Sequence, residues 1–199
     1  MNSASPDIDK ALQAIASHNS EPQRNKRKEE NKKQANILLY EATLYEQKGA
    51  WSEAKRRYEE ALDFDDSYEN NFNYAYFLQS KTPDDRRADK YYLIAVAKCH
   101  TQSQKATTLN NLAVFYADDN TKRQEAEEKY KEALDIYRDL AKTNEAVYAR
   151  DYANTLVMGV YLFGDDKVHL VEALEMLAPY DDSYANVGFL RQIIRQLQE

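Results

Sequence analysis

Few residues of this chain have the types and spacings that catalysis or metal binding requires. The three histidines, His18, His100 and His169, are scattered, and no two are spaced as ligands on one helix face. Cys99 is the single cysteine, so no multi-cysteine metal cluster can form. Cys99 and His100 are adjacent, and adjacent side chains on a helix point about 100° apart, unlike a nucleophile and its base. We therefore expect no catalytic residues and no metal site.

The acidic pairs and the glycines also favour structural roles. Asp84-Asp85, Asp118-Asp119 and Asp165-Asp166 fall at predicted turns, where Asp side chains bind nearby backbone N–H groups. The four glycines are isolated, so the chain has no glycine-rich phosphate loop. These features predict a protein that is not an enzyme and that needs no cofactor.

The composition favours a helical protein over a turn-rich β-protein. The chain has 199 residues but only 4 Gly and 4 Pro, although turns depend on both residues. Its net charge of −7 disfavours association with nucleic acid or anionic lipid. No stretch approaches the roughly 20 apolar residues of a membrane span, and Met1 to Asp7 do not resemble a signal peptide. We expect a soluble, cytoplasmic protein that does not bind membranes.

Two small-residue patterns recur along the chain at intervals of 33 to about 40 residues, a range typical of helical repeats. The first is Ala-x3-Tyr-x2-Ala, which occurs as Ala54-x3-Tyr58-x2-Ala61, Ala88-x3-Tyr92-x2-Ala95 and Ala126-x3-Tyr130-x2-Ala133. The second pattern precedes it and has copies at Leu38-x2-Glu41-Ala42-x2-Tyr45, Asn71-x2-Tyr74-Ala75-x2-Leu78, Leu109-x2-Leu112-Ala113-x2-Tyr116 and Ala149-x2-Tyr152-Ala153-x2-Leu156. Spacings of three and four place these residues on one helix stripe, so each repeat is predicted to be a pair of packed helices.

Turn residues lie where the ends of these helices are expected. Gly49 suits a left-handed C-terminal position, and Thr82-Pro83 with Asp85 suits a helix start. The sequence Asp-Asp-Ser-Tyr occurs at 65–68 and again at 181–184, so we expect both copies to launch helices.

The two ends of the chain are less regular. Ile8, Ala11, Leu12 and Ile15 predict a short helix, and 17–33 predicts a polar linker that is helical only near its end. In the fourth unit, Gly164 predicts a turn after an extended first helix. The second helix could pack through Ala173-x3-Leu177 or through Leu170, Leu174 and Leu177. Apolar residues between 184 and 198 predict a C-terminal capping helix.

These units resemble tetratricopeptide repeats, whose pattern is W-x2-L-G-x2-Y, then A-x3-F, then P. The alanines and aromatics match, and 107–141 resembles the longer-period bacterial subtype of about 40 residues. The opening Trp is replaced by Leu38, Asn71, Leu109 and Ala149, and the glycine by alanine. The resemblance implies an all-α fold, a right-handed α-α superhelix of about four helical hairpins.

We therefore expect an N-terminal short helix and linker at 1–33, followed by four repeats over 34–182. The expected repeats are 34–67, 68–101, 102–143 and 144–182, and the capping helix occupies 183–199.

The resemblance also implies a function, which is to hold a peptide or partner helix in a concave groove lined by the first helix of each repeat. Transferred position by position, the groove-lining residues are Asn36, Leu39, Thr43, Gln47, Glu69, Phe72, Asn73, Tyr76, Gln79, Thr107, Asn110, Asn111, Val114, Arg150, Asn154 and Val157. The expected role is that of a protein-binding scaffold or adaptor.

The identity of the partner is narrowed by one comparison within the family. Relatives that clamp the C-terminal carboxylate of chaperones use lysine and arginine at defined groove positions. Asn73 matches such a clamp, but Leu39, Thr43, Thr107 and Asn111 lie where its other residues should be. A chaperone ligand is therefore not expected.

Two alternatives remain open. Residues 24–33 contain six basic and two acidic residues, a net charge of +4 that leaves −11 elsewhere. This basic run could serve a nucleic-acid-associated helical repeat. The chain could also be the regulatory repeat portion of a larger multidomain protein.

Overall fold

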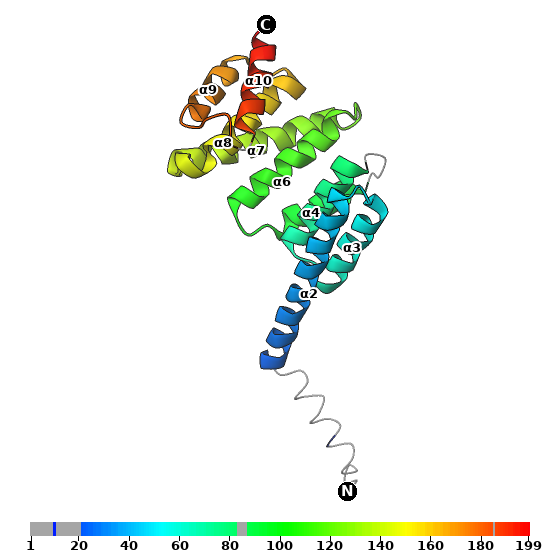
Figure 1. The fold of residues 1–199 in the computed structure, drawn as a ribbon. Coiled ribbons are helices and arrows are strands. Elements are labelled where there is room, and N and C mark those ends of the chain that lie inside the picture. The colour runs from blue at the N-terminus through cyan, green and yellow to red at the C-terminus, as the bar shows by residue number, and fades with distance from the viewer. Residues whose placement is uncertain (1–9, 11–20, 83–86, 185) are drawn as a thin grey trace. The chain divides into compact units, whose positions relative to one another are not determined.

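A computed structural model describes residue 10 and residues 21–82, 87–184 and 186–199. These residues form helices and connecting turns, with no strand among them, which confirms the all-α prediction (Figure 1). The chain divides into two compact units, Met1–Tyr74 and Ala75–Glu199.

The first unit contains α2 (Glu21–Gln47), α3 (Trp51–Phe64) and the first half of α4 (Tyr68–Lys81). Helices α2 and α3 pack side by side through Ala35, Leu38 and Ala61 (Figure 1). Gly49 joins them with a φ of 69°, as its predicted role at a helix end requires. Because this connection is short, the two helices form an antiparallel hairpin.

Helix α2 begins much earlier than the sequence predicts. The expectation that 17–33 is helical only near its end is wrong, because α2 is continuous from Glu21. Pro22 lies in the first turn, where proline is tolerated, and the Arg, Lys, Glu and Gln residues after it are good helix formers.

The second unit contains the end of α4 and the helices from α5 to α10. Their bounds are α5 (Ala88–Lys98), α6 (Gln102–Ala117), α7 (Arg123–Thr143), α8 (Glu145–Met158), η1 (Gly159–Phe163), α9 (Val168–Leu177) and α10 (Val187–Gln198). Helix α6 packs on α5 and α7, and α8 packs on α7 and α9. One core of buried residues runs through the unit from Ala106 to Ile194.

The repeated alanines lie at close contacts between helices. Ala54, Ala88 and Ala126 are all 0% exposed, as are the alanines seven residues after each of them. A methyl group is therefore the largest side chain that these positions hold without a change in helix spacing.

Ala88→Leu is expected to lower the free energy of unfolding by about 2 kcal/mol, because three added carbons would overpack this contact. Chemical denaturation monitored by circular dichroism measures the loss. Ala97→Leu is the matched control, since Ala97 is exposed on the same helix, and it should leave stability almost unchanged. Equal stability of the two variants would contradict this role of the alanines.

Helix α8 continues into a short π-helix, η1, so the helix predicted to open the fourth repeat is extended as expected. Gly164 ends it with a φ of 69°. Tyr130 packs against this π-helix, where its ring stacks on Phe163, and its hydroxyl donates to Asp165 Oδ2 at 2.7 Å. Gly159 makes room for this tyrosine, because a Cβ atom there would lie 1.9 Å from Tyr130 Oη.

Helix α9 combines the two predicted registers. Leu170, Ala173 and Leu177 are all 0% exposed, and Leu174 is only partly buried against the same core. The C-terminal helix is present as α10, which buries Val187, Leu190 and Ile194.

The two Asp-Asp-Ser-Tyr segments differ in how they lead into the next helix. Helix α4 starts at Tyr68 itself, and Asn71 Nδ2 donates to Asp66 Oδ1 at 2.6 Å. In the second copy Asp181 binds Ser183, and α10 begins only at Val187. The predicted helix around Ile8 to Ile15 and the start at Pro83 to Asp85 lie outside the described residues.

None of the described helices combines the length and apolar character that crossing a membrane requires.

Candidate functional site

A pocket of about 600 Å³ opens in the second unit. It is lined by the end of α4, the start of α5, the end of α6 and the turn from α6 to α7. The lining residues are Gln79, Asp89, Val114, Phe115, Tyr116, Asp118, Asp119, Asn120 and Lys122.

Local hydrogen bonds determine where α6 begins and how the chain turns after its end. Thr101 and Gln104 form a reciprocal capping box at its start. After Ala117 the chain turns, and Asp119 N donates to Tyr116 O at 3.0 Å. The Asp119 side chain accepts hydrogen bonds from the backbone N and hydroxyl of Thr121. The prediction that Asp118-Asp119 serves a turn is thus confirmed for Asp119.

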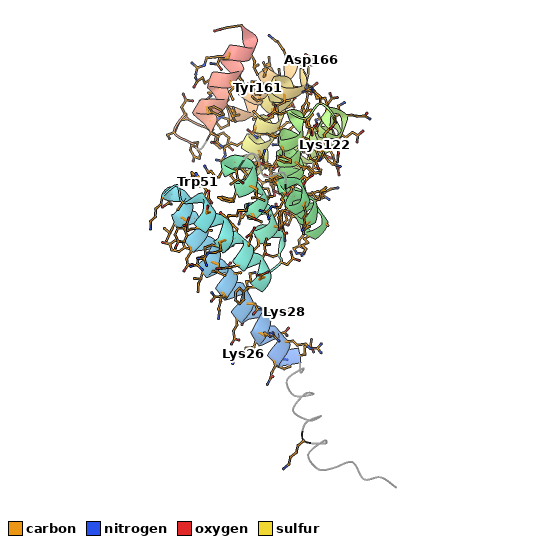
Figure 2. All side chains as sticks on the ribbon, turned by 90° about the vertical axis from the view of Figure 1, so that its right-hand side faces the viewer. Lys26, Lys28, Trp51, Lys122, Tyr161 and Asp166 are labelled. Carbon is orange, nitrogen blue, oxygen red and sulfur yellow. The ribbon has the colours of Figure 1, made fainter. Side chains whose placement is uncertain are left out.

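Lys122, which is labelled in Figure 2, lies directly before α7 and contacts residues of both α5 and α6 at the pocket wall. Its Nζ donates to Asp89 Oδ2 of α5 at 3.1 Å and lies 4.0 Å from the ring centre of Tyr116 in α6. Burial alone would lower the pKa of Lys122, but the hydrogen bond from Lys122 to Asp89 and the neighbouring charges raise it. Burial raises the pKa of Tyr116. With both pKa values raised, Lys122 is charged and the phenol of Tyr116 is neutral at pH 7.

The pocket carries an excess of negative charge. Its ionic side chains at pH 7 are three aspartates and one lysine. Asp89 is paired with Lys122 and Asp119 binds Thr121, whereas Asp118 is exposed. A cationic group of a ligand would therefore be attracted to this pocket.

The side chain of Gln79 in the pocket wall is hydrogen-bonded to a buried tyrosine. Tyr92, which is fully buried in α5, donates its hydroxyl to Gln79 Oε1 at 2.5 Å. The amide of Gln79 therefore has a fixed orientation.

Two groove residues expected from the sequence, Gln79 and Val114, line this pocket together. They come from α4 and α6, the first helices of two successive predicted pairs. Tyr76, one turn before Gln79 on α4, is 53% exposed.

The other expected residues of α6 are engaged in bonds within the protein or are buried. The hydroxyl of Thr107 lies 2.6 Å from the hydroxyl of Tyr137 in α7. Asn111 Nδ2 donates to Thr107 O at 2.9 Å, and Asn110 is only 9% exposed. These side chains stabilise α6 and its contact with α7, and the pocket lining does not include them.

The expected residues of α8 do not line the pocket. The guanidinium of Arg150 lies 5.6 Å and 5.7 Å from the ring centres of Tyr180 and Tyr184. Asn154 is half-buried. Val157 is fully buried in the core and presents no side chain to a groove, because its side of α8 faces that core.

The expected groove residues of the first unit are mostly exposed. Asn36, Thr43, Gln47, Glu69 and Asn73 are exposed, and Leu39 and Phe72 are half-buried. The hydroxyl of Thr43 donates to Leu39 O at 3.0 Å, and Phe72 stacks on Tyr68.

Cys99, His100 and His169 do not line the pocket. Cys99 Sγ donates to Val96 O at the end of α5, and His100 is exposed. His169 Nδ1 lies 3.2 Å from Asp165 Oδ2, and His18 is outside the described residues. Within the described part of the chain, no three His, Cys, Asp or Glu side chains are arranged to hold a metal ion.

Comparison with known proteins gives no assignment. The sequence matches no protein-family model, and it matches no curated protein.

Most of the pocket was not predicted as a site. Asp89, Phe115, Tyr116, Asn120 and Lys122 were missed, because a repeat pattern identifies helix faces and not the turns that meet beside them. The polar run Asp118-Asp119-Asn120-Thr121 directly after a first helix was the available signal.

Proposed function

We propose that this protein is a non-enzymatic, tetratricopeptide-like interaction module that binds an extended segment of a partner protein. The observation that carries the proposal is the pocket in which Gln79 and Val114 meet. The resemblance to tetratricopeptide repeats assigns both residues to the groove, and they come from helices that are equivalent in the repeat pattern.

The chemistry of the lining supports a peptide ligand with a basic residue. The pocket volume lies within the range of about 300–1,000 Å³ that is typical of ligand sites. Val114 and Phe115 offer apolar contact, and the amides of Gln79 and Asn120 can bind a peptide backbone. The excess of aspartate favours a lysine or arginine side chain in the segment.

Val114→Arg is expected to weaken binding of such a peptide at least about tenfold, because a long cationic side chain would fill the pocket and repel a basic ligand. The probe is a set of peptides selected on the native protein from a displayed random library. Their dissociation constants are measured by fluorescence anisotropy. The native protein should select peptides enriched in lysine or arginine.

Val171→Arg is the matched control, since Val171 is exposed on α9 and makes no part of the pocket. It introduces the same side chain and charge but should leave the dissociation constants unchanged. Failure to select any peptide, or equal binding by both variants, would refute the proposal.

A further inference from the structure

The first half of α2 extends beyond its partner helix. Residues 21–34 are all exposed except Asn31, which is partly buried. Figure 2 labels Lys26 and Lys28 on this part of α2. Helix α3 packs on α2 through Ala61 against Ala35 and Leu38, and it ends at Phe64, one turn after Ala61. Since the hairpin is antiparallel, the cover that α3 gives to α2 stops near Asn31. About 15 Å of helix, from Glu21 to near Asn31, therefore projects beyond the hairpin.

The stripe that packs on α3 continues into this projecting part. Its buried members are Ala42, Leu38 and Ala35, at spacings of four and three. The same spacings lead on to Asn31, Lys28 and Arg24. The packing seam thus runs past the end of α3 with basic side chains in place of alanine and leucine.

Charge is segregated between the two sides of the projecting helix. At about 100° per residue, the side centred on the seam carries Arg24, Arg27, Lys28 and Lys32, which we call the basic face. Its one acidic member is Glu21 at the helix start. The opposite side is neutral, because Lys26 and Lys33 are balanced by Glu29 and Glu30, and Lys26 lies 4.0 Å from Glu30.

We propose that the basic face is a docking surface for an acidic α-helix of a partner protein, laid along the seam where α3 ends. Charge complementarity selects an acidic occupant, and continuity with the α2–α3 seam selects a helix. This surface lies in the first unit, and the proposal does not depend on the function of the pocket in the second.

Two other anionic partners fit the observations less well. A nucleic acid carries many phosphates, and the −11 charge of the chain outside 24–33 opposes its approach more than that of a short acidic helix. A membrane-binding helix needs an apolar face, whereas residues 21–34 contain no apolar side chain besides Pro22.

The probe is a synthetic, alanine-rich helical peptide that carries glutamates along one face. Its binding to the full chain is measured by fluorescence anisotropy at low salt. The double variant Arg24→Gln with Lys28→Gln removes two charges from the basic face. It should weaken binding about tenfold, as expected for two favourable charge contacts. A peptide with lysines in place of the glutamates should not bind.

The double variant Lys26→Gln with Lys33→Gln is the matched control, because it removes two charges from the neutral side of the same helix. It should weaken binding less than about twofold. Circular dichroism checks that both variants keep their helix. The charge-conserving pair Arg24→Lys with Lys28→Arg should bind as the native protein does, which separates charge from any change in helix content.

Three results would each overturn the proposal. One is no binding of the glutamate peptide by the native chain. Another is equal weakening by the two double variants, which would indicate general attraction and not a docking face. The third is tighter binding of a single-stranded RNA, a duplex DNA or phosphatidylserine vesicles than of the peptide under the same conditions.

Discussion

Gly159→Ala is expected to lower the free energy of unfolding by about 3 kcal/mol, at the upper end of the usual range for overpacking. The added Cβ would lie 1.9 Å from Oη and 2.3 Å from Cζ of Tyr130. Tyr130 cannot easily move away, because it is 1% exposed, stacks on Phe163 and donates to Asp165. Denaturant unfolding measures the loss.

Gly164→Ala is a control for this prediction, since it is the same substitution five residues later. Nothing lies within 4 Å of a Cβ there, so only its φ of 69° is unfavourable, at about 1 kcal/mol. Combining Gly159→Ala with Tyr130→Leu should cost less than the sum of the single variants, because leucine lacks the clashing atoms. Simple additivity would show that the two residues do not conflict.

Stability is expected to fall steeply above about pH 10, the ordinary pKa of tyrosine. Burial raises the pKa of Tyr58, Tyr92 and Tyr130, and hydrogen bonds to carboxylates raise that of Tyr58 and Tyr130 further. Above about pH 10 the unfolded chain loses these protons while the folded protein keeps them, so alkali favours unfolding. Each hydroxyl then lowers the free energy of unfolding by about 1.4 kcal/mol per pH unit.

Below about pH 10 both states are protonated, and these hydroxyls contribute no pH dependence. Urea unfolding at a series of alkaline pH values tests the prediction. Tyr92→Phe should be less stable than the native protein at neutral pH, because it loses the bond to Gln79, but its alkaline slope should be shallower by one proton. Stability that is flat to pH values well above 10 would contradict the role of burial.

The helices were predictable where alanine and tyrosine recur, because small residues at close contacts and turn residues between them constrain the chain locally. Gly49, Gly164 and the C-terminal helix belong to this predictable part. The π-helix does not, since it depends on the close approach of Tyr130 to Gly159, a contact between residues 29 positions apart.

The start of α2 was missed for a different reason. Apolar periodicity is the main sequence signal of a helix, and residues 21–34 lack it. Their helix depends instead on the propensity of charged residues and on extension from the packed half of α2, and neither leaves an apolar pattern.

The candidate pocket was predictable only in part. The family resemblance assigned Gln79 and Val114 to one groove, and both line the pocket. It assigned Val157 to the same groove, but that side chain is fully buried in the core. Asp89 and Lys122 are brought together by the packing of α5 and the turn before α7, which are 33 residues apart in the sequence. Pairings of that kind depend on tertiary packing and leave no local signal.

The hydrogen bond between Tyr92 and Gln79 determines which atoms the pocket can offer to a ligand. The phenol donates to the carbonyl oxygen of the Gln79 side chain, so the amide keeps one acceptor position on that oxygen and the two N–H donors of its NH2 group. A bound segment would meet this point most favourably with a carbonyl oxygen. A tyrosine in the interior, without touching the ligand, thereby sets the hydrogen-bonding polarity of the surface above it.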